Sequence, residues 1–224
     1  MNYNLQPLIE LYEQHADPEY GKRMKAYMKG QFDYLGLPSP LRRELSKRFF
    51  AEQGYPDPNI VQDIAEKCWQ MPFREYKYFA MELMVRMKKK SAHDAIFLYE
   101  RLITDQSWWD TTDLIAPSLV GFHFLKYPEE RVDYINKWIS SGNIWLQRSC
   151  ILFQLKYKLD TDTRLLGSII LRLKDSKEFF IRKAIGWSLR EYSKRDPGFV
   201  VRFIQTHDLS GLSNREAMKW IERQ

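Results

Sequence analysis

The chain has 224 residues, of which 44% are hydrophobic and 29% charged, so we expect a globular protein, neither disordered nor membrane-embedded. Glycine and proline number only 10 each, which argues against an all-β protein with its many Gly-rich turns. The formal net charge of +6 is uneven: residues 22–48 and 164–202 carry +6 each and the rest carries −6, which suggests a polyanionic partner.

Apolar residues recur at helical spacing along most of the chain, and short polar breaks separate these segments. About ten helices of ordinary length fit between the breaks, and nothing resembles a flexible linker. We therefore expect a single all-α domain spanning residues 1–224. The breaks lie at residues 36–40, 54–58, 88–92, 104–107, 126–128, 140–143, 160–162, 175–177 and 195–197.

The first basic segment ends one predicted helix in a Gly-Leu-Pro-Ser-Pro turn at residues 36–40 and begins the next. The turn presents Ser39 and backbone N–H groups, with Arg42 and Arg43 behind them and Tyr27 upstream. Backbone N–H groups and arginines are common phosphate ligands, so a phosphate seat is one interpretation. The alternative is a plain turn followed by a basic helix face.

A weak repeat follows, in which similar helical segments end at Leu83, Leu119, Leu155 and Leu189. A second helix precedes each segment, so the unit is a helix pair of about 35–40 residues, within the range of HEAT-type solenoids. Stacked units would form a curved array with a concave basic groove lined by the second helices. Asp113, Arg148 and Arg182 would then occupy nearly equivalent inner positions. A non-repeating helical bundle remains the alternative.

The densest candidate cluster is the Ser-Trp-Trp-Asp-Thr-Thr-Asp segment at residues 107–113. Ser107 or Asp105 could cap the following helix, and Trp109 and Asp113 fall on one helix face at i, i+4. The structural interpretation is an acidic residue at a helix start beside a core tryptophan. The functional interpretation is an aromatic wall beside a carboxylate, suited to a cationic ligand.

Two further candidates lie downstream. Arg148 begins the next inner helix and could equally be a solvated arginine. Residues 179–190 mix aromatic and basic side chains, which suit base stacking and phosphate contacts, although an amphipathic helix with a buried Trp187 explains the pattern too. Gly186 inside this helix weakens it by ~1 kcal/mol, which suggests close approach of another group. The candidates for DNA contact are Phe179, Phe180, Arg182, Lys183 and Arg190.

Several classes of site have no support in the sequence. The four histidines are scattered and no Cys-x-x-Cys occurs, so we expect neither a metal nor a cofactor. Phosphate-binding glycine loops and a serine-hydrolase elbow are missing as well. Two cysteines, no secretory segment and no apolar run of ~18 residues favour a cytoplasmic protein without a membrane partner, associated with the nucleoid in a prokaryote.

Taken together, these motifs resemble the AlkD-type DNA alkylation repair glycosylases over nearly the whole chain. The similarity is carried by residues 26–32 with the turn at 36–40, by the Trp-x-x-x-Asp element of residues 109–113, by Gln147 and Arg148, and by residues 180–192. The resemblance implies a stack of HEAT-like repeats that cradles duplex DNA. It also implies hydrolysis of the N-glycosidic bond of N3- and N7-alkylated purines, leaving an abasic site.

The resemblance further implies roles for individual residues. It makes Asp113 the catalytic aspartate, Trp109 and Trp187 the tryptophans facing the lesion, with Tyr27 at the cleft. Arg148 belongs to the same catalytic set; we assign it to a DNA phosphate, and it could also orient Asp113. An alkylated purine is already a good leaving group, so a carboxylate that stabilises the oxocarbenium-like sugar and positions water suffices. The expected partner is duplex DNA containing alkylated purines, bound by a monomer.

Two functions from other classes stay open at this stage. One is a non-catalytic relative that binds distorted DNA through the same basic groove, and the other is a HEAT scaffold for a protein partner. The intact Asp113 and Arg148 favour the glycosylase over the first, and the two basic segments favour DNA binding over the second.

Overall fold

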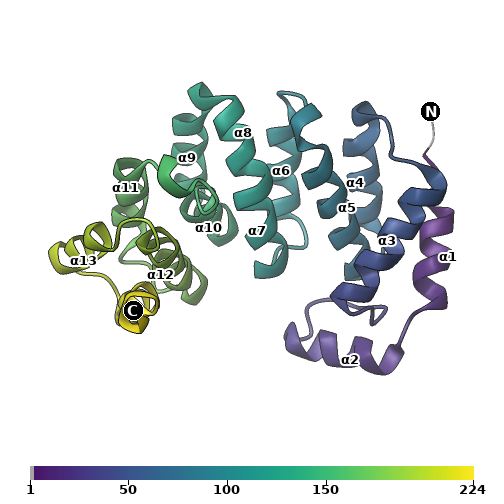
Figure 1. The fold of residues 1–224 in the computed structure, drawn as a ribbon, viewed down its shortest axis with the longest axis horizontal. Helices are drawn as coiled ribbons and strands as arrows, with labels where there is room; N and C mark the ends of the chain where they lie inside the picture. The colour runs from purple at the N-terminus through teal and green to yellow at the C-terminus, as the bar shows by residue number, and fades with distance from the viewer. Residues whose placement is uncertain (1–2) are drawn as a thin grey trace. The chain divides into compact units, whose positions relative to one another are not determined.

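The computed structural model describes residues 3–224, which fold into helices α1 to α14 without any strand (Figure 1). An isolated bridge between Asp33 and Phe73 is the one extended pairing in this range. The prediction of an all-α protein is therefore confirmed. The chain divides into two units, one ending at Ala92 and the other running from His93 to Gln224.

The first unit contains five α-helices and two short 3₁₀ turns. They are α1 (Gln6–Gln14), α2 (Pro18–Tyr27), α3 (Ser39–Gln53), η1 (Pro58–Ile60), α4 (Val61–Gln70), α5 (Arg74–Met87) and η2 (Lys88–Lys90). Helix α1 packs on α3, and α4 packs on α5. The core includes Tyr12, Phe49, Trp69 and Phe79, each at most 1% exposed.

A buried carboxylate holds the turn between α2 and α3. Glu75, at the start of α5, accepts hydrogen bonds from the backbone N–H groups of Leu35, Gly36 and Leu37 at 3.0, 2.9 and 3.2 Å. Gly36 has φ +89°, and a Cβ there would lie 1.9 Å from the carbonyl oxygen of Asp17. The turn therefore requires glycine at this position, and its N–H groups are already bound.

The second unit contains the remaining helices. They are α6 (Ala95–Thr104), α7 (Trp109–Ile115), the π-helix η3 (Ala116–Val120), α8 (Gly121–Lys126), η4 (Pro128–Glu130), α9 (Arg131–Ser140), α10 (Ile144–Leu152), η5 (Lys158–Asp160), α11 (Thr163–Leu173), α12 (Phe179–Ser193), α13 (Pro197–Thr206), α14 (Gly211–Met218) and η6 (Ile221–Arg223). Helix α10 packs between α7 and α12, and α14 packs on α12.

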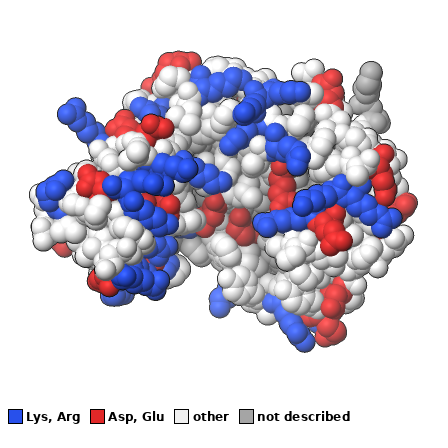
Figure 2. Space-filling model, viewed as in Figure 1, with Lys and Arg blue, Asp and Glu red and all other residues white. Residues whose placement is uncertain are grey.

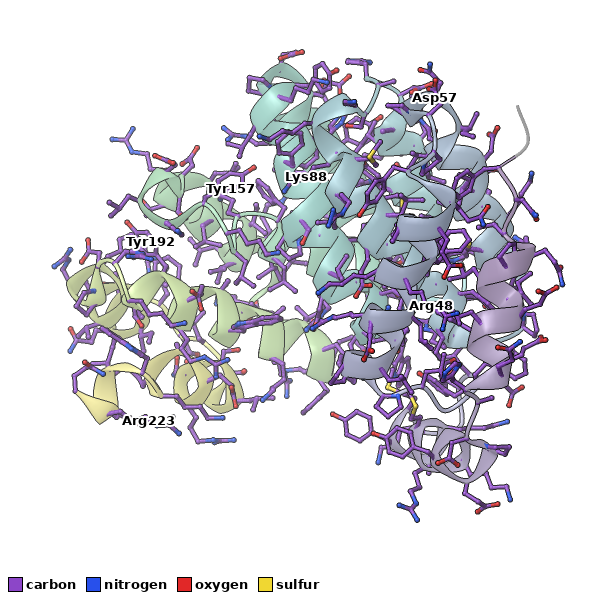
Figure 3. The ribbon with its side chains drawn as sticks, turned by 45° about the vertical axis from the view of Figure 1, so that its right-hand side comes forward. Arg48, Asp57, Lys88, Tyr157, Tyr192 and Arg223 are labelled. Atoms are coloured by element: carbon purple, nitrogen blue, oxygen red, sulfur yellow. The ribbon has the colours of Figure 1, made fainter. Side chains whose placement is uncertain are left out.

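The π-helix follows α7 directly. Pro117 has no backbone N–H, so the carbonyl of Asp113 receives no hydrogen bond from the residue four positions later. Widening of a helix by one residue at such a point is common near functional sites. Tyr157, labelled in Figure 3, lies after α10, and its hydroxyl donates to the carbonyl of Gly121 at 2.6 Å, which fixes the start of α8 to this segment.

The predicted breaks fall between helices, but the sequence predicts too few of them. Breaks after Gln14, Gln70 and Thr206 also occur, so more helices form than the ten or so expected. The repeat register agrees at Leu83, Leu119 and Leu189, each at most 1% exposed. It fails at Leu155, which lies in a turn beyond the end of α10 and is half-buried.

Gly186 explains how closely α14 approaches α12. A Cβ at this position would lie 2.4 Å from Cβ of Glu216 and 2.7 Å from the carbonyl oxygen of Ser213. The Ser213 hydroxyl also donates to the carbonyl of Arg182 at 3.0 Å. The close approach expected from a glycine inside this helix is therefore confirmed.

Gly186→Ala should destabilise the protein. Alanine is the better helix former by ~1 kcal/mol, but overpacking typically costs about 1–3 kcal/mol, and a backbone oxygen at 2.7 Å cannot yield as a side chain can. We expect a net loss of about 1–2 kcal/mol in the free energy of unfolding, measured by denaturant titration. Gly211→Ala is the control, since a Cβ there meets only the end of the Arg215 side chain, at 3.4 Å. Equal stability of the two variants would contradict this account.

Candidate functional site

A charged pair joins three neighbouring helices of the second unit. Arg148 on α10 donates from Nε and Nη2 to the two carboxylate oxygens of Asp113 on α7, at 2.7 and 2.9 Å. Its remaining nitrogen, Nη1, donates to the backbone carbonyl of Phe180 on α12. One guanidinium thus fixes α7, α10 and α12 relative to each other, in the two-point geometry that only arginine provides.

The local sequence explains why Arg148 is placed so firmly. Asn143 caps α10, and its side chain accepts from the N–H groups of Trp145 and Leu146 at 2.9 and 3.2 Å. Arg148 follows Trp145 by three residues and lies on the same face. The Arg148 side chain is 5% exposed and that of Asp113 is 19% exposed, so the carboxylate keeps an opening to solvent.

An aromatic cluster of Trp108, Trp145 and Phe180 includes the residue whose carbonyl binds the guanidinium. The ring centroids lie 5.6 Å apart for Trp108 and Trp145, 5.4 Å for Trp108 and Phe180, and 5.0 Å for Trp145 and Phe180. Cζ of Arg148 lies 6.0 Å from the centroid of Phe180. These rings exclude water from one side of the ion pair, which strengthens its electrostatic interaction.

Burial raises the pKa of the Asp113 carboxyl, while the hydrogen bonds and charge of Arg148 act in the opposite direction. The negative charge of Asp110 adds to the upward shift. Burial is the largest of these effects, so Asp113 titrates above the usual range of an aspartate. The hydrogen bonds and charge of Arg148 favour the ionised form of this buried carboxyl.

The two tryptophans predicted to face a lesion lie on two of the three helices that Arg148 joins, α7 and α12. Trp109 is the first residue of α7, one turn before Asp113, and Trp187 lies on α12, seven residues after Phe180. Both are half-buried. Neither Ser107 nor Asp105 caps α7, because the N-cap position falls on Trp108, whose backbone is extended.

The predicted DNA-contacting residues of α12 differ in what they bind. Phe179 is 57% exposed, whereas Phe180 belongs to the aromatic cluster. Arg182 donates from Nε to the carbonyl of Ser176, which turns its side chain back onto its own helix start. Lys183 and Arg190 contact Glu216 on α14 at 2.7 and 2.9 Å.

In the first unit, only part of the predicted phosphate seat is open. The N–H groups of residues 35–37 are bound by Glu75, and the Arg42 guanidinium is buried in a two-point contact with Glu82, at 3.0 and 2.9 Å. These N–H groups and Arg42 are therefore bound within the protein, by the buried Glu75 and the half-buried Glu82. Three of the predicted residues stay accessible: Ser39, Tyr27 at 72% exposed, and Arg43, whose side chain is 65% exposed.

Neither Trp145 nor Glu216 was predicted from the sequence. The signal for Trp145 was its spacing of one helical turn from Arg148. Glu216 gave no such signal, since it lies 26 residues after Arg190. Among residues 3–224, no group of three His, Cys, Asp or Glu side chains is arranged to hold a metal ion. The same residues contain no helix with the length and apolar character needed to cross a bilayer.

Arg148→Met should leave the Asp113 carboxyl buried without a counter-ion. We expect a loss of about 3–5 kcal/mol in the free energy of unfolding at neutral pH. Without Arg148 the folded-state pKa of Asp113 rises further, so the loss is present above that pKa and is relieved as pH falls through it.

The control is the double variant Asp113→Asn/Arg148→Met, which lacks the titrating group. Its stability should not show this extra pH dependence. Denaturant titrations of both variants from neutral pH downward provide the measurement. Parallel pH curves for the two variants would show that Arg148 does not hold the ionised form of Asp113.

The chain is similar to known proteins over most of its length. Residues 8–221 match the model of the family described as DNA alkylation repair enzyme. A solved structure, described as a predicted DNA alkylation repair enzyme from Enterococcus faecalis, is 31% identical, with 93% of this chain and 98% of that chain covered and a TM-score of 0.84. A search of curated proteins found no match. The chain belongs to the family of DNA alkylation repair enzymes.

Proposed function

We propose that the protein is a monofunctional DNA glycosylase that releases N3- and N7-alkylated purines from duplex DNA. The observation that supports this most is the Asp113–Arg148 pair, a carboxylate that is 19% exposed and bound by Arg148, with the half-buried Trp109 one turn before it on α7. Family membership supports DNA repair as the setting.

In the proposed reaction, water attacks C1′ of the nucleotide and the C1′–N bond to the purine breaks, with the bonding electrons leaving on the purine. The alkylated purine carries a positive charge and leaves neutral, so it needs no acid. Asp113 stabilises the oxocarbenium-like sugar and accepts a proton from the water. The products are the free base and an abasic site.

The other residues of the site have positioning and binding roles in this proposal. Arg148 is a positioning residue, because its two hydrogen bonds fix both oxygens of the carboxylate. Trp109 and Trp187 pack on the sugar and on the cationic base, each contact contributing about 0.5–2 kcal/mol. Tyr27, Ser39, Arg43, Phe179, Phe180, Arg182, Lys183 and Arg190 are the proposed contacts to DNA.

The finer architecture also belongs to the proposal. We infer a solenoid of HEAT-like helix pairs with a concave basic groove that receives the duplex, acting as a monomer in the cytoplasm or on the nucleoid. The repeat of 34 to 36 residues and the two basic segments of the sequence support it. So does the order of packing of α7, α10 and α12 within the second unit.

Asp113→Asn should abolish base release. Incubation with a duplex containing 7-methylguanine, followed by quantification of free base, should show a loss of about 10²–10⁴-fold, because the isosteric amide neither carries the negative charge nor accepts a proton from water. Asp133→Asn, the same change at an exposed position of α9, is the control and should retain release.

Either of two results would remove the assignment. One is undiminished release by Asp113→Asn, and the other is no release by the wild-type protein. Tight, salt-sensitive binding of DNA without release would instead identify a non-catalytic DNA-binding protein. Absence of measurable affinity for duplex DNA would favour a scaffold for a protein partner.

The rate of base release should fall on the acidic side with the titration of Asp113. The ionised form is the active one, and burial raises its pKa, so the rate should decline as pH falls through a value above the usual ~3.9 of aspartate. The measurement is the single-turnover rate at saturating enzyme from pH 7 downward. A rate that is flat until ordinary aspartate values would show that a carboxyl other than Asp113 controls the reaction.

A further inference from the structure

Three basic side chains converge on a single carboxylate where α12 meets α14. Nζ of Lys183 lies 2.7 Å from Oε1 of Glu216, and Nη1 of Arg190 lies 2.9 Å from Oε2. Lys219, in the turn that follows α14, also donates to Oε1. Three positive charges and one negative charge give this cluster, defined by these four residues, a net charge of +2.

The carboxylate is buried and the cations cover it. The Glu216 side chain is 7% exposed, whereas those of Lys183, Arg190 and Lys219 are 35%, 29% and 44% exposed. Burial acts to raise the pKa of Glu216, but the hydrogen bonds and charges of the two lysines lower it to about 2. Glu216 therefore stays ionised at neutral pH, and the cluster presents an ordered positive surface to solvent.

The cluster has more hydrogen-bond donors than Glu216 can accept. Two ammonium groups and a guanidinium carry about eleven N–H donors, whereas a carboxylate offers about four lone-pair sites. The surplus donors belong to one exposed group, Lys219, and two partly exposed groups, Lys183 and Arg190. A tetrahedral anion with several acceptor oxygens matches this arrangement better than a single carboxylate does.

The frame behind the cluster is rigid. Gly186 lets the backbone of α14 approach α12 within a distance that no other residue would allow. Ser210 caps α14 by accepting from the N–H of Ser213 at 3.2 Å. Figure 2 shows several Lys and Arg side chains close together on the face of the second unit where these helices lie. The positions of the three cations are thus fixed before any ligand arrives.

We propose that Lys183, Arg190 and Lys219 form one phosphate-binding site, ordered by Glu216, and that its ligand is a backbone phosphate of duplex DNA. The choice of DNA rests on the proposed function. The sequence singled out Lys183 and Arg190 but neither Lys219 nor α14. The C-terminal helix is therefore part of the DNA-binding surface, and Glu216 is its positioning residue.

The test is the affinity of the full chain for an undamaged duplex, measured across a range of salt concentrations. Lys219→Gln removes one phosphate contact and should lower the affinity about 3–10-fold at low salt. The slope of log affinity against log salt should become shallower by about 0.9, the value for one phosphate contact on duplex DNA. Lys219→Arg keeps the charge and should retain both affinity and slope.

Lys137→Gln is the matched control. Lys137 lies on α9 outside the basic segments and pairs with Glu100 at 2.8 Å, so its loss changes the net charge equally at another place. Its slope should stay close to that of the wild-type protein. Thermal unfolding of each variant shows that the fold is retained.

Equal salt slopes of the affinity for Lys219→Gln and Lys137→Gln would overturn the proposed phosphate site. A salt slope for Lys219→Gln equal to that of the wild-type protein would overturn it as well. An undamaged duplex contains no base to release, so a protein without glycosylase activity still reports on the site. Conversely, active base release with an unchanged salt slope in Lys219→Gln would refute the site and leave the proposed function intact.

Discussion

The candidate site depends on one guanidinium, that of Arg148 on α10, which donates hydrogen bonds to both α7 and α12. Arg148 donates hydrogen bonds to both carboxylate oxygens of Asp113 and to the backbone carbonyl of Phe180. The neighbouring rings of the aromatic cluster keep water away from one side of this site. Replacement by lysine would keep the charge but lose the two-point geometry. The same interaction joins the helices and favours the ionised form of the carboxyl, so the stability of the fold and the proposed chemistry both depend on this residue.

Carboxylates organise the basic regions of this protein in the same way. Glu82 holds Arg42 and Arg43, Glu75 holds the turn before α3, and Glu216 holds the cations of α12 and α14. A carboxylate paired with cations reduces the net positive charge, but it fixes where the remaining charge lies. For a protein that is to grip phosphates at defined positions, such order reduces the entropy lost on binding.

The features that could be predicted from the sequence are those that depend on the spacing of nearby residues. The all-α class, the polar breaks and the i, i+4 relation of Trp109 and Asp113 all follow from helical periodicity. The resemblance identified Asp113 and Arg148, and the structure brings them into direct contact. By contrast, the carboxylates that bind Arg42 and Lys183 come from helices 30 to 40 residues away, and periodicity carries no information about such pairs. Some predicted helix boundaries were wrong for a local reason. The helix α10 ends at Leu152, where the chain turns, although the residues that follow are still largely apolar.

In the proposed mechanism, Asp113 acts on the reacting sugar and does not contribute to the affinity for DNA. The most direct measurement is the single-turnover rate of 7-methylguanine release by the wild-type protein and Asp113→Asn, with the affinity of each for the same duplex determined in parallel. The account predicts that the rate constant collapses by two orders of magnitude or more, on the scale of ~10²–10⁴ for such catalysis, while the affinity changes little. A variant that binds more weakly but releases the base at the wild-type rate once saturated would contradict it.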